Sequence, residues 1–267
     1  MNDVEISVPP PCSPPIIPPA TPTETPPRLP WGFWATTGFG VALISIYVFA
    51  QSIVTVGYMV IEALWHHGKI SLKLEEVAMD GDVLGIAVIL GAPVVILFAG
   101  LFIKLRHGPA LVNYLGLNWP RWRAVILWSL GMAAVLISGE VLTMLINRPV
   151  VPDVMIDVYR TADFKPVLWL AIIILGPAVE EIIFRGFLFH GWKESRLGSW
   201  GTIVLTAASW AIIHLQYDFY GIATIFAYGI FLGLVRLRTG SVLLCTGLHC
   251  ALNLIATIQA ELYLAKA

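Results

Sequence analysis

Long apolar stretches dominate the chain from Trp31 onward and are seldom interrupted by charge. A helix needs about 20 residues to cross the hydrocarbon core of a bilayer, and backbone polar groups cannot be left unpaired in lipid. We therefore interpret the stretches as transmembrane helices in an all-α, polytopic bundle of about seven spans. The predicted spans are residues 33–61, 83–103, 124–146, 166–190, 200–216, 219–235 and 241–263. The spans 200–216 and 219–235 are short and nearly contiguous, so we expect a tight helical hairpin there.

The composition agrees with a membrane protein. Hydrophobic residues make up 58% of the chain and charged residues 12%, with a mean hydropathy of +0.81, whereas about 25% of a soluble domain is charged. The net charge of −1 provides no basic field for nucleic acid, so membrane lipid is the expected environment. The three cysteines form no CxxC pair, which argues against a disulfide framework or a zinc ribbon.

The first 30 residues differ from the rest, because they hold eleven of the eighteen prolines. Such density removes amide donors and favours extended, solvated backbone, so we predict a disordered tail over 1–30 and a membrane domain over 31–267. The tail lacks the charged start and continuous apolar core of a signal peptide. A partner for its proline motifs is unknown.

Basic residues suggest an orientation, since cytoplasmic loops are enriched in Lys and Arg. With the N-terminus inside, nine basic residues lie inside and six outside. The inside set is Arg28, Lys104, Arg106, Arg121, Arg123, Lys193, Arg196, Arg236 and Arg238, and the outside set is Lys69, Lys73, Arg148, Arg160, Lys165 and Lys266. This bias favours an N-inside arrangement.

Three charged residues occur together in the apolar segment GPAVEEIIFRGF, residues 176–187. A charge at the centre of a bilayer costs about 2.5–3.5 kcal/mol on insertion scales. At 100° per residue Glu180 and Glu181 point in different directions, while Arg185 lies on the face of Glu181 and can pair with it. Glu180 is then free to face another helix. The alternative is a cap of charges snorkelling at the membrane surface.

Two further helices carry polar side chains. His214 follows Trp210 by four residues, so the indole can form a wall of the imidazole's pocket. His249 and Asn253 are also four apart and share one face of the last span. The alternative reading of the second pair is hydrogen-bonded contact between helices, which contributes roughly 0.6–2 kcal/mol per bond.

These residues form one constellation if the three helices pack together. Glu180 and His214 can hold and deprotonate a water molecule, while His249 and Asn253 can donate to the oxyanion formed when that water attacks an amide carbonyl. Neither a serine nor a cysteine has a suitable partner arrangement, so water is the expected nucleophile. Zinc bound by Glu180, His214 and His249 is the alternative, although no HExxH helix is present and an amide is a poor zinc ligand. We therefore predict that no cofactor is required.

The sequence resembles the CPBP family of intramembrane proteases, which includes the eukaryotic prenyl-protein (CAAX) endopeptidase and bacterial bacteriocin-processing relatives. Its EExxxR motif is matched by Glu180, Glu181 and Arg185, its F/WxxxH motif by Trp210 and His214, and its HxxxN/D motif by His249 and Asn253. The stretch LRTGSV, residues 237–242, also resembles the family pattern. The motifs lie within 176–253, and the resemblance covers about residues 110–260.

The resemblance implies a helical membrane fold around a hydrophilic cavity and an intramembrane endopeptidase in which Glu180, His214, His249 and Asn253 are catalytic. Glu181, Arg185 and Trp210 are then supporting residues. Members are often labelled metalloproteases, which leaves zinc open as an alternative. The expected substrate is a peptide or membrane-anchored protein, with a prenylated CAAX protein suggested by the eukaryotic relatives. Short loops favour a bacterial cytoplasmic membrane, and a non-catalytic immunity or scaffold protein is the alternative function.

Overall fold

All regular structure described for the chain is helical. The computed structural model describes residues 32–65, 73–105 and 110–266, and the predicted proline-rich tail lies outside these ranges. The elements in order are α1 (Phe33–Trp65), α2 (Leu74–Ala78), α3 (Gly81–Leu105), α4 (Leu111–Leu115), α5 (Trp122–Leu145), α6 (Asp153–Thr161), α7 (Lys165–Trp169), η1 (Leu170–Leu175), α8 (Gly176–Glu181), η2 (Ile182–Leu188), α9 (Phe189–Lys193), α10 (Gly198–Ile212), α11 (Phe219–Thr239) and α12 (Val242–Leu264).

Six helices in these ranges are long and apolar enough to cross a membrane. They are α1, α3, α5, the continuous helix Lys165–Lys193, α11 and α12. The polytopic helical bundle predicted from the sequence is thus confirmed. The expected seventh span, 200–216, corresponds to α10, which has only 15 residues and falls short of the roughly 20 that a full crossing needs.

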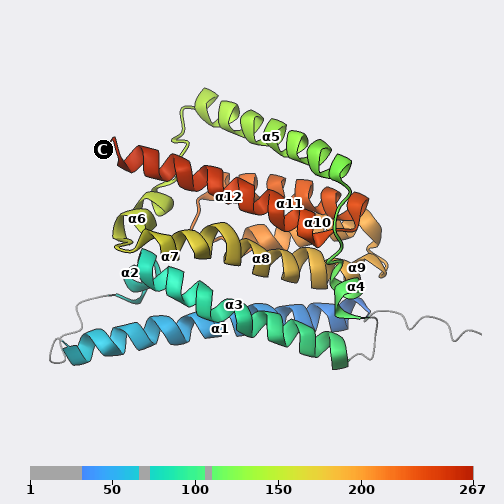
Figure 1. Cartoon of the computed structure of the whole chain (residues 1–267), viewed down its shortest axis with the longest axis horizontal. Helices are drawn as coiled ribbons and strands as arrows, with labels where there is room; N and C mark the ends of the chain where they lie inside the picture. The colour runs from blue at the N-terminus through green and yellow to red at the C-terminus, as the bar shows by residue number, and fades with distance from the viewer. Residues whose placement is uncertain (1–31, 66–72, 106–109, 267) are drawn as a thin grey trace, which may run out of the picture.

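The long helices lie side by side along one axis (Figure 1). The pair α1 and α3 packs against one side of the continuous helix Lys165–Lys193, and α10, α11 and α12 pack on the other, with α5 outermost against α11 and α12. Residues of the continuous helix form the centre of the main core. At most 2% of the surface is exposed in each of four residues of this helix, Val179, Ile183, Phe184 and Phe187.

Large aromatic side chains mark both ends of the bundle. Exposed Trp34, Trp119, Trp122 and Trp200 lie at or just before the starts of α1, α5 and α10, which are at the same end of the bundle in Figure 1. Exposed Trp65, Phe164, Phe219 and Tyr263 lie at the opposite end. Trp and Tyr are enriched where hydrocarbon meets water, so these groups indicate the two membrane interfaces.

The predicted hairpin is formed by α10 and α11, which pack closely through small residues. Gly229 and Gly233 lie one turn apart on α11, and an added Cβ would lie 2.9 Å from Ala207 Cβ at the first and 3.0 Å from Ile203 at the second. Small residues at this spacing let helices approach closely in membranes. The close approach also lets the Gly229 carbonyl accept a hydrogen bond from Arg185 of the continuous helix.

The close contact predicts that Gly229→Ala is destabilising. Its Cβ would force the helices apart against Ala207 backbone, and overpacking of this kind costs about 1–3 kcal/mol. Gly247→Ala on the exposed side of α12 meets no atom within 4 Å and is the matched control. Since alanine favours helix over glycine by about 0.5–1 kcal/mol, the control should unfold at an equal or higher temperature. Thermal unfolding of both variants in detergent measures the difference, and equal midpoints would contradict the packing.

Candidate active site

The two adjacent glutamates lie between two π-helical segments of the continuous helix. Glu180 and Glu181 end α8, with η1 before it and η2 after it. The side chain of Glu181 is fully buried, whereas that of Glu180 is 20% exposed, so the two point in different directions as the sequence predicted. Because Glu181 and Arg185 are both completely buried, the snorkelling alternative does not apply to this pair.

Glu181 and Arg185 form the ion pair expected from their spacing. Arg185 Nη1 donates to Glu181 Oε1 at 2.8 Å, and Nη2 donates to the carbonyl of Gly229 at 3.2 Å. The guanidinium carbon also lies 4.6 Å from the centroid of the Trp210 ring. The buried charge of each residue is therefore stabilised by the other and by polar or aromatic groups of two neighbouring helices.

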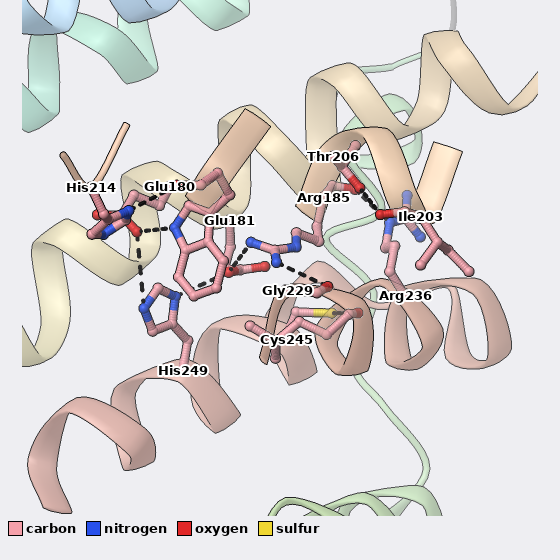
Figure 2. A network of polar contacts seen from close by, with 12 residues as sticks. Glu180, Glu181, Arg185, Ile203, Thr206, His214, Gly229, Arg236, Cys245 and His249 are labelled. Atoms are coloured by element: carbon pink, nitrogen blue, oxygen red, sulfur yellow. Dashed lines mark hydrogen bonds and ion pairs between the residues drawn. The ribbon is translucent and has the colours of Figure 1, made fainter. Parts of the chain in front are cut away.

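His249 joins this pair from α12. Its Nδ1 lies 3.0 Å from Glu181 Oε1, the same oxygen that accepts from Arg185, and its Nε2 lies 3.9 Å from Glu180 Oε2. The ring is almost completely buried. Glu181 thus holds the imidazole so that its other nitrogen faces the more exposed carboxylate, Glu180 (Figure 2).

Trp210 forms hydrogen bonds with both Glu180 and His214, the two residues that the sequence predicted to activate water. Its indole Nε1 donates to Glu180 Oε2 at 2.6 Å, and its backbone carbonyl accepts from His214 Nδ1 at 2.8 Å. Its ring also meets those of His214 and His249 edge-on, with centroids 5.4 and 5.0 Å apart. The sequence predicted only a wall for the imidazole, because helical spacing says nothing about which residue the indole N–H reaches on another helix.

The contact of His214 also decides its tautomer. A carbonyl oxygen only accepts hydrogen bonds, so Nδ1 carries the proton in the neutral ring and Nε2 keeps its lone pair. The nitrogen that could accept a proton from water is therefore the one not bonded to Trp210. His214 itself lies just beyond α10, in the turn that leads to α11.

Asn253 makes a contact that the sequence did not predict. Its Nδ2 donates to the carbonyl of Ile172 at 2.8 Å. In the π-helical segment η1 each amide donates to the carbonyl five residues earlier, as Gly176 does to Ala171. By the same pattern the amide of residue 177 would donate to the carbonyl of Ile172. Residue 177 is a proline without an N–H, and the Asn253 amide takes its place. The second N–H of that amide makes no hydrogen bond to the described residues.

Tyr217 is a neighbour that motif reasoning missed. It lies in the turn between α10 and α11, and its ring centroid is 6.3 Å from that of His214. Burial, together with the nearby charge of Glu180, raises the pKa of Tyr217 to about 12. Its hydroxyl therefore stays protonated at neutral pH. The only signal in the sequence was the three-residue spacing between His214 and Tyr217. That spacing indicates a shared face in a helix, but it does not fix the direction of a side chain in a turn.

The residues proposed as alternative zinc ligands do not converge as a ligand set. Throughout the described ranges, no group of three or more His, Cys, Asp or Glu side chains is arranged to hold a metal ion. Glu180 and His249 approach to 3.9 Å, while Glu180 is bonded to Trp210.

The different burial of the two glutamates predicts different effects of the same substitution. Glu181→Gln removes the charge that Arg185 needs, and breaking a buried pair costs about 3–5 kcal/mol. Glu180→Gln retains an oxygen that accepts from Trp210 and should change stability much less. Thermal unfolding of both variants in detergent provides the comparison. Equal losses of stability would contradict the distinction.

The comparisons with known proteins agree with the motifs. Residues 162–255 match a family described as type II CAAX prenyl endopeptidase Rce1-like. No curated protein and no solved structure matches the chain. The matched region contains both glutamates, Trp210, both histidines and Asn253. The fold brings the glutamates, Trp210 and the histidines together, whereas Asn253 bonds to the Ile172 carbonyl. Residues 162–255 are therefore similar to the Rce1-like type II CAAX prenyl endopeptidases, in agreement with the motifs.

Proposed function

We propose that the protein is an intramembrane endopeptidase that cleaves a membrane-associated substrate with water activated by Glu180 and His214. The observation that carries the proposal is the pair of hydrogen bonds at Trp210, whose indole donates to the Glu180 carboxylate and whose carbonyl accepts from the His214 imidazole. The family match supports a peptidase. A prenylated CAAX protein is the substrate class that the family description suggests.

The water is held between Glu180 and the free Nε2 of His214. The nucleophile needs its proton removed as it attacks the scissile carbonyl, and positioned general bases contribute about 10²–10⁴-fold to such steps. Glu180 is the partly exposed member of the glutamate pair and so is open to water. The proton taken from the water is then returned to the leaving amine, which conserves charge over the cycle.

The oxyanion is stabilised from α12. In this proposal His249 donates through Nδ1 to Glu181, and its Nε2, when it carries a proton, donates to the developing charge. The second N–H of Asn253 is the other donor. Donors already fixed in place, here by Glu181 and by the Ile172 carbonyl, need no reorganisation when the charge develops.

The site's position favours substrates that are themselves held at the membrane. Glu180, His249 and Asn253 belong to helices of membrane-spanning length, and His214 lies between α10 and the spanning helix α11. A lipid anchor or hydrophobic segment would concentrate the substrate at this depth. We also propose that the protein lies in a bacterial cytoplasmic membrane with its N-terminus inside. A hydrophilic cavity around the site is a further part of the proposal.

Removing either water activator should strongly slow cleavage. Glu180→Gln and His214→Ala are each expected to lower kcat by about 100-fold or more on a membrane-anchored reporter peptide, because each removes a general-base group. The wild type should keep its turnover after exhaustive chelation. Unfolding midpoints close to that of the wild type would show that both variants remain folded.

Two results would reject parts of this mechanism. Unchanged turnover in a folded Glu180→Gln protein would reject the catalytic assignment and favour a non-catalytic membrane protein. Loss of wild-type activity on chelation, restored by zinc, would replace the proposed mechanism by the zinc alternative.

The Trp210 hydrogen bond predicts a defect in kcat with little change in KM. Trp210→Phe keeps an aromatic ring beside His214, His249 and Arg185 but removes the donor to Glu180. A hydrogen bond to a charged group contributes about 1.5–3 kcal/mol, so kcat should fall by roughly tenfold or more. Steady-state kinetics on the same reporter measures both constants. A rise in KM at unchanged kcat would show that Trp210 serves substrate binding instead.

A further inference from the structure

A pocket of about 270 Å³ lies away from the candidate active site, where α4, α9 and the end of α11 meet. Its walls carry more basic and amide groups than acidic ones. The lining residues are Asn113, Gly116, Asn118, Phe189, His190, Lys193, Glu194, Arg236, Leu237 and Gly240. In Figure 2 Arg236 lies at the opposite end of the polar network from His214 and Glu180.

Arg236 is the buried cation of this pocket. Its side chain donates from Nε to the Arg185 carbonyl at 2.7 Å, from Nη2 to the Leu115 carbonyl at 3.3 Å, and from Nη1 to the Gly240 carbonyl. The residue is only 8% exposed, and the guanidinium lies 5.7 Å from the Phe189 ring centroid. Its partners are neutral dipoles and an aromatic face.

The charge of Arg236 therefore lacks an acidic partner within the described residues. No carboxylate there forms an ion pair or hydrogen bond with it, and two of its five N–H groups remain after the three carbonyl bonds. A buried charge is costly unless an opposite charge pairs with it. An anion entering the pocket would supply that partner.

The other lining groups fit an oxyanion. Lys193 and His190 stand on α9, and the side-chain amides of Asn113 and Asn118 offer further N–H donors. Glu194 is the acidic member of the lining and opposes an anion. The tetrahedral oxygens of a phosphate group suit a guanidinium, an ammonium and amides arranged around one space.

The pocket also lies at the depth of lipid headgroups. The end of α9, the start of α12 and the turn after α4 belong to the same end of the bundle as the starts of α1, α5 and α10 (Figure 1). Exposed Trp34, Trp119, Trp122 and Trp200 mark that end as a membrane interface. Basic pockets between helices at such an interface favour phosphate-bearing headgroups.

We propose that this pocket binds the phosphate of an anionic phospholipid headgroup, with Arg236 and Lys193 supplying the positive charge. The inference is independent of the proposed protease chemistry, because none of the lining residues belongs to the candidate active site. Gly116, at φ 73°, leaves room for the guanidinium, since an added Cβ there would lie 2.4 Å from Arg236 Nη2.

The test uses the full chain purified in detergent micelles and titrated with phosphatidylglycerol, phosphatidylcholine or inorganic phosphate. A ligand that binds the folded state raises the unfolding temperature with its concentration. Phosphatidylglycerol should raise the midpoint saturably, and phosphatidylcholine should not. If inorganic phosphate gives the same shift, the site takes free phosphate and the assignment to a lipid headgroup is wrong.

Substitutions of opposite sign locate the binding. Lys193→Gln should weaken the apparent affinity by about fivefold, and Glu194→Gln should strengthen it by a similar factor, as expected for one exposed charge. Arg123→Gln removes a basic residue at the same end but outside the lining, and should leave the affinity unchanged. Equal losses of affinity for Lys193→Gln and Arg123→Gln would show that only diffuse surface charge attracts the lipid, and would overturn the proposal. A wild-type protein that no anion stabilises would also overturn it.

Discussion

The buried carboxylate of Glu181 is the constraint on which the active-site arrangement depends. A charge without solvent needs partners, and Glu181 finds Arg185 on its own helix and His249 on α12. Arg185 in turn bonds to the Gly229 carbonyl on α11. One carboxylate thereby fixes how three helices meet, and the imidazole of His249 takes its direction from a group that has no proposed contact with substrate.

The π-helical segments around the glutamates explain how one continuous helix offers so many polar contacts. A π-turn changes the hydrogen-bond register, and such turns are frequent at functional sites. In η1 the register meets Pro177, which cannot donate, and Asn253 satisfies the Ile172 carbonyl instead. Beyond α8, the Arg185 carbonyl in η2 accepts from Arg236. Contacts to one helix thus link the candidate active site to the basic pocket at the membrane interface.

Much of this could be predicted from the sequence, because its signals are local. The length of the apolar runs gives the spans, and the four-residue spacing of Glu181 and Arg185 gives their pairing. The same spacing placed His249 and Asn253 on one face of α12. The sequence predicts a span over 200–216, whereas α10 ends at Ile212 after 15 residues, because a hydropathy pattern does not locate the end of a helix.

Contacts between helices could not be obtained in this way. Nothing in the spacing of Trp210 and His214 shows that the indole N–H reaches Glu180, or that the backbone carbonyl sets the His214 tautomer. Nor does spacing connect Asn253 with Pro177. The sequence by itself determined a helical membrane bundle and its reactive side chains, because helical periodicity and apolar length are properties of one segment. Only the tertiary structure decided their partners, because those depend on how separate helices pack.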